Sequence, residues 1–170
     1  PVLLLLTLVE LGSGLVLGSF ERTLLRSPSL LVLVPVTIGT AGTLGSVLAA
    51  RLSTAFHLGT LSFDPTDETL AGNALATIGM ALTVFPFVGG GAWLVTSVTG
   101  EPQLALSTVL SVSITSGAVL AVMAVAVTIV ATLVAYRFGL DPDDVVIPIV
   151  TNTCDVLGVV VLFLVVRLLV

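Results

Sequence analysis

Charged side chains are scarce in this sequence, and lysine is missing altogether. Only 9% of the 170 residues are charged, and five arginines face ten acids. Soluble domains carry a charge on roughly a quarter of their residues, so the deficit argues against a soluble globular domain. Nucleic acid is not expected as a partner either, because phosphate binding requires clustered basic side chains.

Cysteine and histidine are equally rare, with one residue of each, Cys154 and His57. One cysteine cannot form a disulfide within the chain. A site for a soft metal such as Zn²⁺ needs several sulfur or imidazole ligands, and the chain cannot supply them. His57 is predicted to lie in a connector between two apolar stretches.

Long apolar runs make up most of the chain, since 56% of its residues are hydrophobic. These runs lack the alternation of outer-membrane barrel strands, and helices satisfy every backbone group inside lipid. We therefore predict an all-α, polytopic membrane protein that is multi-pass in the cell membrane. A span needs about 20 residues, and five stretches are long enough: residues 2–20, 30–50, 69–95, 104–136 and 145–170.

The five stretches predict a single transmembrane domain over residues 1–170. Pro86 and the glycines at 89–91 can break or kink a helix, so the sequence does not fix where the third span ends. The fourth span is so long that it must tilt, protrude from the lipid or break near Gly117. Five helices offer little room for a pathway, which favours a symmetric dimer.

Two acids lie well inside the spans, where a charge costs a few kcal/mol on insertion scales and marks a functional candidate. Asp155 is ten residues into its span, which is about 15 Å at 1.5 Å per residue. Glu10 is eight residues into the first span, about 12 Å deep by the same measure. The depth of Asp155 is close to the membrane midplane.

Asp155 shares a helix face with Thr151 and Asn152, which precede it by four and three residues. Pro148 lies on the same side and frees the backbone carbonyl of Asp144. Such oxygen ligands suit hard cations, and Mg²⁺ sheds its water reluctantly. Two copies of Asp155 across a two-fold axis would repel each other, and a hydrated divalent cation would neutralise both. The alternative is a protonated Asp155 that hydrogen-bonds to another helix.

Other polar groups have two interpretations each. Glu10 has no polar companions on its own helix face, so cation binding and interhelical hydrogen bonding stay open. In the second span, Thr43 can line a pathway, although the small residues at 38–46 favour close helix packing. Acids at 64–68 and 141–144 suit helix starts, and they can also concentrate cations at a pore mouth.

Three segments carry a resemblance to a known family. LVPVTIGTAGTLGSVLAARLSTAFHLG, at 33–59, resembles the second-helix signature of the MgtE-type magnesium transporters and of the related eukaryotic solute-carrier magnesium transporters. GLDPDDVVIPIVTNTCDVLG, at 139–158, resembles the loop and pore helix of that family. SFERTL, at 19–24, is similar to its Phe-Glu pair between the first two helices.

The resemblance implies a homodimeric five-helix domain with a cytoplasmic N-terminus and a cation pore at the two-fold interface. Asp155 matches the pore aspartate of the family, and Gly39, Gly42 and Gly45 match the second-helix glycines. Bacterial members usually carry Asn where this chain has Thr43, which replaces an amide by a hydroxyl. The cytoplasmic regulatory portion of the family is not among these residues.

We predict a divalent-cation channel or transporter, with Mg²⁺ as the expected ion and Mn²⁺ or Ca²⁺ as alternatives. The expected partners are a second copy of the chain, membrane lipid and divalent cations. The predicted metal-binding residues are Asp155, Asn152, Thr151, Thr43 and Glu10.

Two other functions belong to different classes. A structural membrane subunit without transport of its own is the first alternative, and ion flux into liposomes separates it from a transporter. An intramembrane aspartyl enzyme needs two acids positioned together, and neither Asp155 nor Glu10 lies in a Gly-x-Gly-Asp context. A serine nucleophile needs a histidine partner in the membrane. We therefore predict that the chain is not an enzyme.

Overall fold

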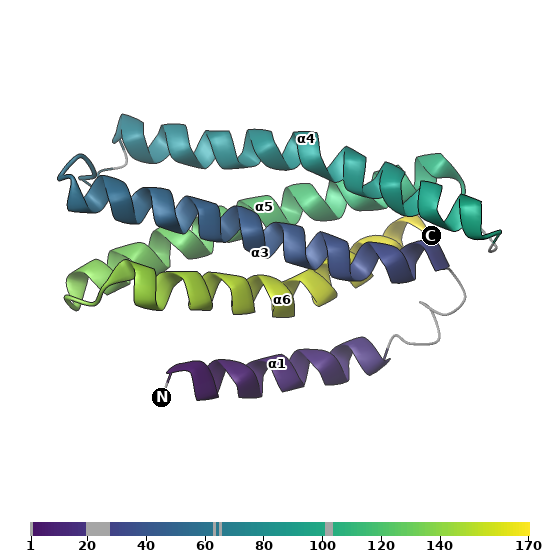
Figure 1. Cartoon of the computed structure of the whole chain (residues 1–170), viewed down its shortest axis with the longest axis horizontal. Helices are drawn as coiled ribbons and strands as arrows, with labels where there is room; N and C mark the ends of the chain where they lie inside the picture. The colour runs from purple at the N-terminus through teal and green to yellow at the C-terminus, as the bar shows by residue number, and fades with distance from the viewer. Residues whose placement is uncertain (1, 20–27, 63, 65, 101–103) are drawn as a thin grey trace.

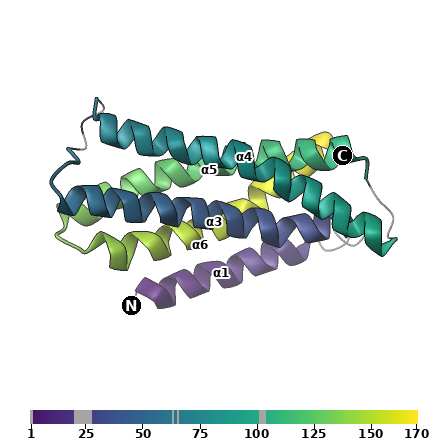
Figure 2. The same cartoon turned by 45° about the horizontal axis from the view of Figure 1, so that its top comes forward.

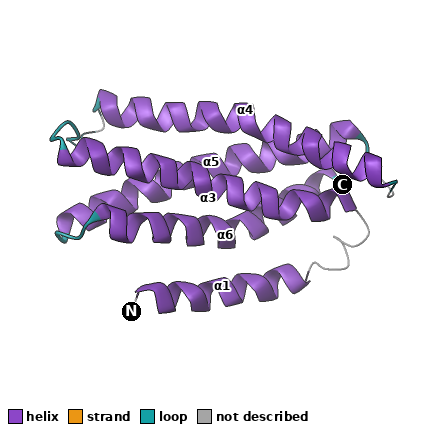
Figure 3. Cartoon of the chain, in the orientation of Figure 1, coloured by secondary structure: helices purple, strands orange, loops and turns teal. Residues whose placement is uncertain are grey.

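A computed structural model describes the chain except for residues 1, 20–27, 63, 65 and 101–103, and except for the side chains at 2–6 and 9. The described part is helical and contains no strand (Figure 3). Its helices are α1 Val2–Ser19, α3 Pro28–His57, α4 Glu68–Thr99, α5 Leu106–Arg137 and α6 Pro142–Leu169. The predicted all-α class is confirmed. The Phe-Glu pair at 20–21 lies outside the described residues.

Four helices, α3 to α6, have the length and apolar composition required to cross a membrane. They form a bundle in which consecutive helices run in opposite directions (Figure 1). The α3–α4 and α5–α6 connections lie together at one end of this bundle. α1 contacts α6 and no other described helix, and it lies on the outside of the bundle (Figures 1 and 2). That α1 is a fifth span stays a prediction.

Several helix ends differ from the sequence-based prediction. α3 continues past residue 50 to His57, so Arg51 lies within the helix and His57 is its last residue rather than part of a connector. The charged Arg51 does not end the helix because its side chain is exposed and can reach water along the helix surface. α6 begins at Pro142, three residues earlier than predicted, because Asp141 accepts a hydrogen bond from the Asp143 N–H and caps the helix.

The breaks considered for the third and fourth spans do not occur. α4 passes through Pro86 and the glycines at 89–91 and ends before Gly100, whose φ of 73° is left-handed. α5 is continuous through Gly117. Gly117 instead lets the ring of Phe85 pack directly against the α5 backbone, since any Cβ there would overlap the ring. Nearby, Ser113 donates a 2.7 Å hydrogen bond to the Phe85 carbonyl.

Glycine also permits the close approach of α3 to α6. Val150 of α6 occupies the space that a Cβ on Gly45 would need, and Ile38 of α3 does the same at Gly158. Gly42 faces the Thr151 backbone, with 3.8 Å between its Cβ position and the Thr151 Cα. Close packing is therefore confirmed for Gly42 and Gly45. Gly39 differs, because nothing in the described structure lies within 4 Å of its Cβ position.

Candidate cation site

Asp155 lies at the centre of α6, thirteen residues from Pro142 and fourteen from Leu169. In a helix that crosses the membrane, this position is close to the midplane. The side chain is half-buried and makes no hydrogen bond with any residue that the structure describes. Asp155 is thus a carboxylate at membrane depth that the described part of the chain leaves partly open.

The packing of α3 against α6 fixes which part of α3 lies beside Asp155. The two helices run antiparallel (Figure 1), and Gly42 faces Thr151 while Ile38 faces Gly158. Asp155 falls between Thr151 and Gly158 along α6, and it therefore lies at the level of residues 39–41 on α3. Gly39, at this level, faces open space.

The polar side chains before Asp155 donate hydrogen bonds to backbone carbonyls of α6. The Thr151 hydroxyl donates to the Ile147 carbonyl at 3.0 Å, and the Asn152 amide donates to the Pro148 carbonyl at 2.9 Å. Both side chains are half-buried. The Thr151 hydroxyl hydrogen and one Asn152 amide hydrogen are engaged, and the oxygens of both side chains remain as acceptors. An acceptor-rich face beside a carboxylate suits a cation or the water that hydrates it.

Thr43 lies at the midpoint of α3, on the side of the helix that the bundle leaves exposed. Its hydroxyl donates to the Gly39 carbonyl at 2.8 Å, which also leaves its oxygen as an acceptor. Thr43 directly follows Gly42, the residue that contacts Thr151. Thr43 therefore lies one residue from the contact between α3 and α6, with its side chain exposed.

Glu10 lies near the midpoint of α1 and is exposed. It is close enough to Asp155 to act on it electrostatically. Glu10 has no charged neighbour on its own helix face. Its neighbour Asp155 belongs to α6, and the two acids come within electrostatic range because α1 packs on α6. No signal in the sequence indicates this proximity.

Gly158 has a packing role that the residue type alone does not reveal. It gives Ile38 room to approach α6, one turn after Asp155. The sequence shows a glycine three residues after an intramembrane acid. That this glycine makes room for Ile38 is visible only once α3 is in place beside α6. Gly158 and Gly42 therefore allow α3 and α6 to pack closely on both sides of Asp155 along α6.

The described residues contain no group of three or more His, Cys, Asp or Glu side chains that could surround a metal ion. Mg²⁺ usually keeps several waters and takes one or two carboxylates. The arrangement around Asp155 fits that mode of binding.

Two acids in the α3–α4 and α5–α6 connections, Asp67 and Asp141, cap the helices that follow them. Asp67 accepts hydrogen bonds from the Thr69 and Leu70 N–H groups and caps α4, as Asp141 caps α6. The backbone N–H and hydroxyl of Ser62 also donate to Asp67 and lower its pKa to about 2. The helix-start interpretation is confirmed for these two acids. The attraction of cations by this end of the bundle stays a prediction.

The sequence model of the MgtE family, described as a divalent cation transporter, matches residues 34–165. The chain belongs to the MgtE family. The match includes Thr43, Thr151, Asn152 and Asp155, and it leaves Glu10 outside. MgtE proteins are transporters and not enzymes, which confirms the prediction against an enzyme. Family membership and the four apolar helices together identify a multi-pass membrane protein.

This MgtE chain is also similar to two mammalian proteins. Solute carrier family 41 member 3 of Mus musculus is 27% identical over 157 residues, which cover 89% of this chain and 32% of that protein. The same member from Rattus norvegicus is 28% identical over 138 residues, which cover 79% and 30%. The MgtE chain therefore spans about a third of the length of the curated relatives that it matches.

Proposed function

We propose that the chain moves divalent cations, Mg²⁺ above all, across the cell membrane through a pore between two copies. The observation that supports this function best is the half-buried Asp155 carboxylate at the centre of a membrane-spanning helix. A charge at this depth is costly unless it is paired or faces water. In the described part of one protomer, Asp155 has no hydrogen-bond partner and no ion pair.

A two-fold axis beside α3 and α6 would place the two Asp155 side chains opposite each other. Two carboxylates in such a site repel, and a dication between them removes the repulsion. The exposed side of α3 around Thr43 and Gly39 would complete the pathway wall. The site is therefore complete only in a homodimer.

The ion in this pore is proposed to be hydrated. Mg²⁺ gives up its water reluctantly, so direct coordination by several protein groups is unfavourable. The oxygens of Thr151, Asn152 and Thr43 would accept hydrogen bonds from the water shell, while Asp155 supplies the charge. Glu10 adds a second carboxylate within electrostatic range. Oxygen groups accept Mn²⁺ and Ca²⁺ as well, so competition among these ions tests the selectivity.

The test is Mg²⁺ uptake by liposomes that contain the purified full chain and an internal Mg²⁺ indicator. The wild type is expected to take up Mg²⁺, and Asp155→Ala is expected to fall to the rate of empty liposomes. Thr83→Ala removes an exposed polar side chain from α4, a helix that does not contact α6, and serves as the control, with uptake close to that of the wild type. Size-exclusion profiles and helicity establish that both variants fold.

Two results would contradict the proposal in different ways. Uptake by Asp155→Ala at the wild-type rate would show that this carboxylate is not the ion site. A folded wild type that takes up no divalent cation at all would favour the structural subunit instead.

A further inference from the structure

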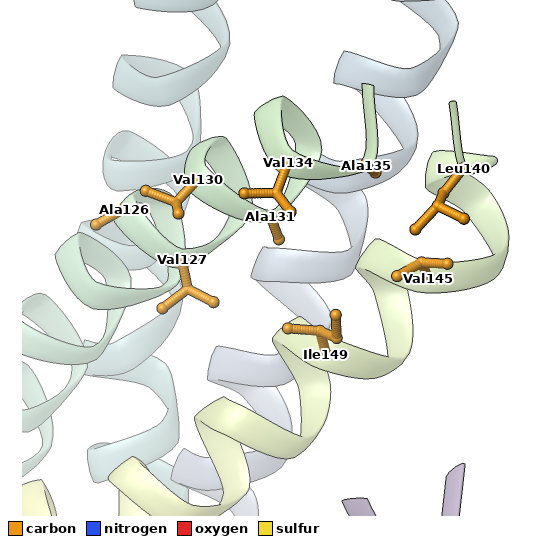
Figure 4. A pocket seen from close by; sticks show the side chains of 9 residues that line it. All are labelled: Ala126, Val127, Val130, Ala131, Val134, Ala135, Leu140, Val145 and Ile149. Atoms are coloured by element: carbon orange, nitrogen blue, oxygen red, sulfur yellow. The ribbon is translucent and has the colours of Figure 1, made fainter. Parts of the chain in front are cut away.

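A groove lies between α5 and α6 near the connection that joins them. It encloses a cavity of about 410 Å³. Figure 4 shows side chains of both helices arranged around this space. All of the lining residues are apolar, and they are Ala126, Val127, Val130, Ala131, Val134, Ala135, Leu140, Val145 and Ile149.

The groove opens at the outer surface of the bundle. Val130 and Val134, on its α5 wall, are 60% and 45% exposed. Both residues belong to a helix that is long and apolar enough to cross the membrane, so the opening faces hydrocarbon. Valine and alanine side chains are short, and they leave a channel that a flexible apolar chain can fill.

One end of the groove carries a positive charge. Val127, Val130, Val134 and Arg137 follow one another at intervals of three and four residues, so they share one face of α5. Arg137 is the last residue of that helix and is exposed. It forms no hydrogen bond or ion pair with any described residue. The next acid along the chain, Asp141, instead accepts a hydrogen bond from the Asp143 N–H at 3.0 Å.

We propose that this groove binds one anionic phospholipid, with an acyl chain between α5 and α6 and the phosphate at Arg137. A guanidinium matches phosphate oxygens with two parallel hydrogen bonds. Basic side chains near helix ends attract anionic headgroups at the membrane surface. Asp141, Asp143 and Asp144 begin α6 beside the groove-lining Leu140 and Val145 and repel such headgroups, so the attraction is confined to the α5 side of the groove, where Arg137 lies. The proposal concerns a site apart from Asp155 and does not depend on ion transport.

The experiment compares two lipids with the same acyl chains on the full chain in detergent micelles. Dioleoylphosphatidylglycerol or dioleoylphosphatidylcholine is added, and bound lipid is counted by native mass spectrometry. One phosphatidylglycerol per chain is expected at concentrations where phosphatidylcholine does not bind. Arg137→Gln is expected to weaken phosphatidylglycerol binding about tenfold, since it removes a charge-assisted phosphate contact.

Two further variants separate the groove from the charge. Ala131→Phe fills the groove and is expected to lower the binding of both lipids. Arg167→Gln removes the same charge from the last turn of α6, at the other end of the bundle, and is expected to bind phosphatidylglycerol as the wild type does.

Equal retention of both lipids by the wild type would overturn the proposal, and this comparison needs no variant. Retention of phosphatidylglycerol by Arg137→Gln at the wild-type level would also overturn it. A second copy of the chain in the groove would give disulfide-linked dimers of Val130→Cys and lipid binding that Ala131→Phe does not change, and this result would replace the lipid as the occupant.

Discussion

Thr37 is completely buried on α3, and its hydroxyl has no hydrogen-bond partner among the described residues. An unpaired buried hydroxyl costs free energy that an apolar group of the same shape does not. Thr37→Val is therefore expected to leave the free energy of unfolding unchanged or to raise it by about 1 kcal/mol. Unfolding in mixed micelles, followed by helicity, measures the change.

Thr96 on α4 provides the matched control for Thr37. It is also buried, but its hydroxyl lies 3.0 Å from that of Ser29, which is buried as well. Thr96→Val leaves the Ser29 hydroxyl without this partner, and a loss of about 1–3 kcal/mol is expected. Equal losses for Thr37→Val and Thr96→Val would show that the Thr37 hydroxyl has a partner in the membrane.

Asp67 gives the chain a pH dependence at acidic pH. Its pKa in the folded chain is about 2, below the ordinary value of 3.8, because the Ser62 N–H donates to the carboxylate, as do the Leu70 N–H and the Ser62 hydroxyl. A depressed pKa stabilises the fold above pH 4, and this contribution is lost as the pH falls from about 4 to about 2. Asp67→Asn is expected to melt at a lower temperature than the wild type at pH 6, with a smaller further decrease between pH 4 and pH 2.

The control for this effect is Glu68→Gln, which changes the adjacent, exposed acid. Melting temperatures of the three proteins at pH 6, 4, 3 and 2 separate the two positions. A pH profile of Asp67→Asn that coincides with the wild type would contradict the assignment.

Helix α4 crosses α5 where Phe85 lies against Gly117, and this crossing depends on the missing side chain. A methyl group at position 117 would overlap the ring of Phe85, which is itself buried. Gly117→Ala is therefore expected to lower the free energy of unfolding by about 1–3 kcal/mol. Gly72→Ala, on α4, meets nothing within 4 Å in the described structure and is expected to raise it by up to about 1 kcal/mol. A neutral Gly117→Ala would mean that the two helices separate at little cost.

The helices show which features local sequence can predict. Apolar length predicts α3 to α6, and the spacing of Thr151, Asn152 and Asp155 predicts their common face. The helix ends are less predictable, because an exposed charge such as Arg51 can reach water without ending the helix. The proximity of Glu10 to Asp155 depends on how α1 packs on α6, and no spacing within one helix contains that information.

In the whole molecule, the polar groups of the candidate site gather on one side of the bundle. Asp155 belongs to α6, and α1 contacts α6 alone. α4 contacts α3 and α5 but neither α6 nor α1, so it lies on the other side. The proposed dimer, with its axis beside α3 and α6, would therefore bring Thr43 of each copy toward the other and keep the outer face of α4 in lipid.

Thiol cross-linking distinguishes this dimer from other arrangements. Cys154 is buried and is first replaced by alanine, after which Thr43→Cys or Phe87→Cys introduces one reactive thiol. Phe87 is 82% exposed on α4, which makes it the matched control away from the proposed axis. A short bis-maleimide is expected to give covalent dimers with Thr43→Cys only, and Mg²⁺ is expected to slow the reaction because it occupies the pathway. Dimers from Phe87→Cys, with none from Thr43→Cys, would place the interface on α4 and leave each Asp155 without its counterpart.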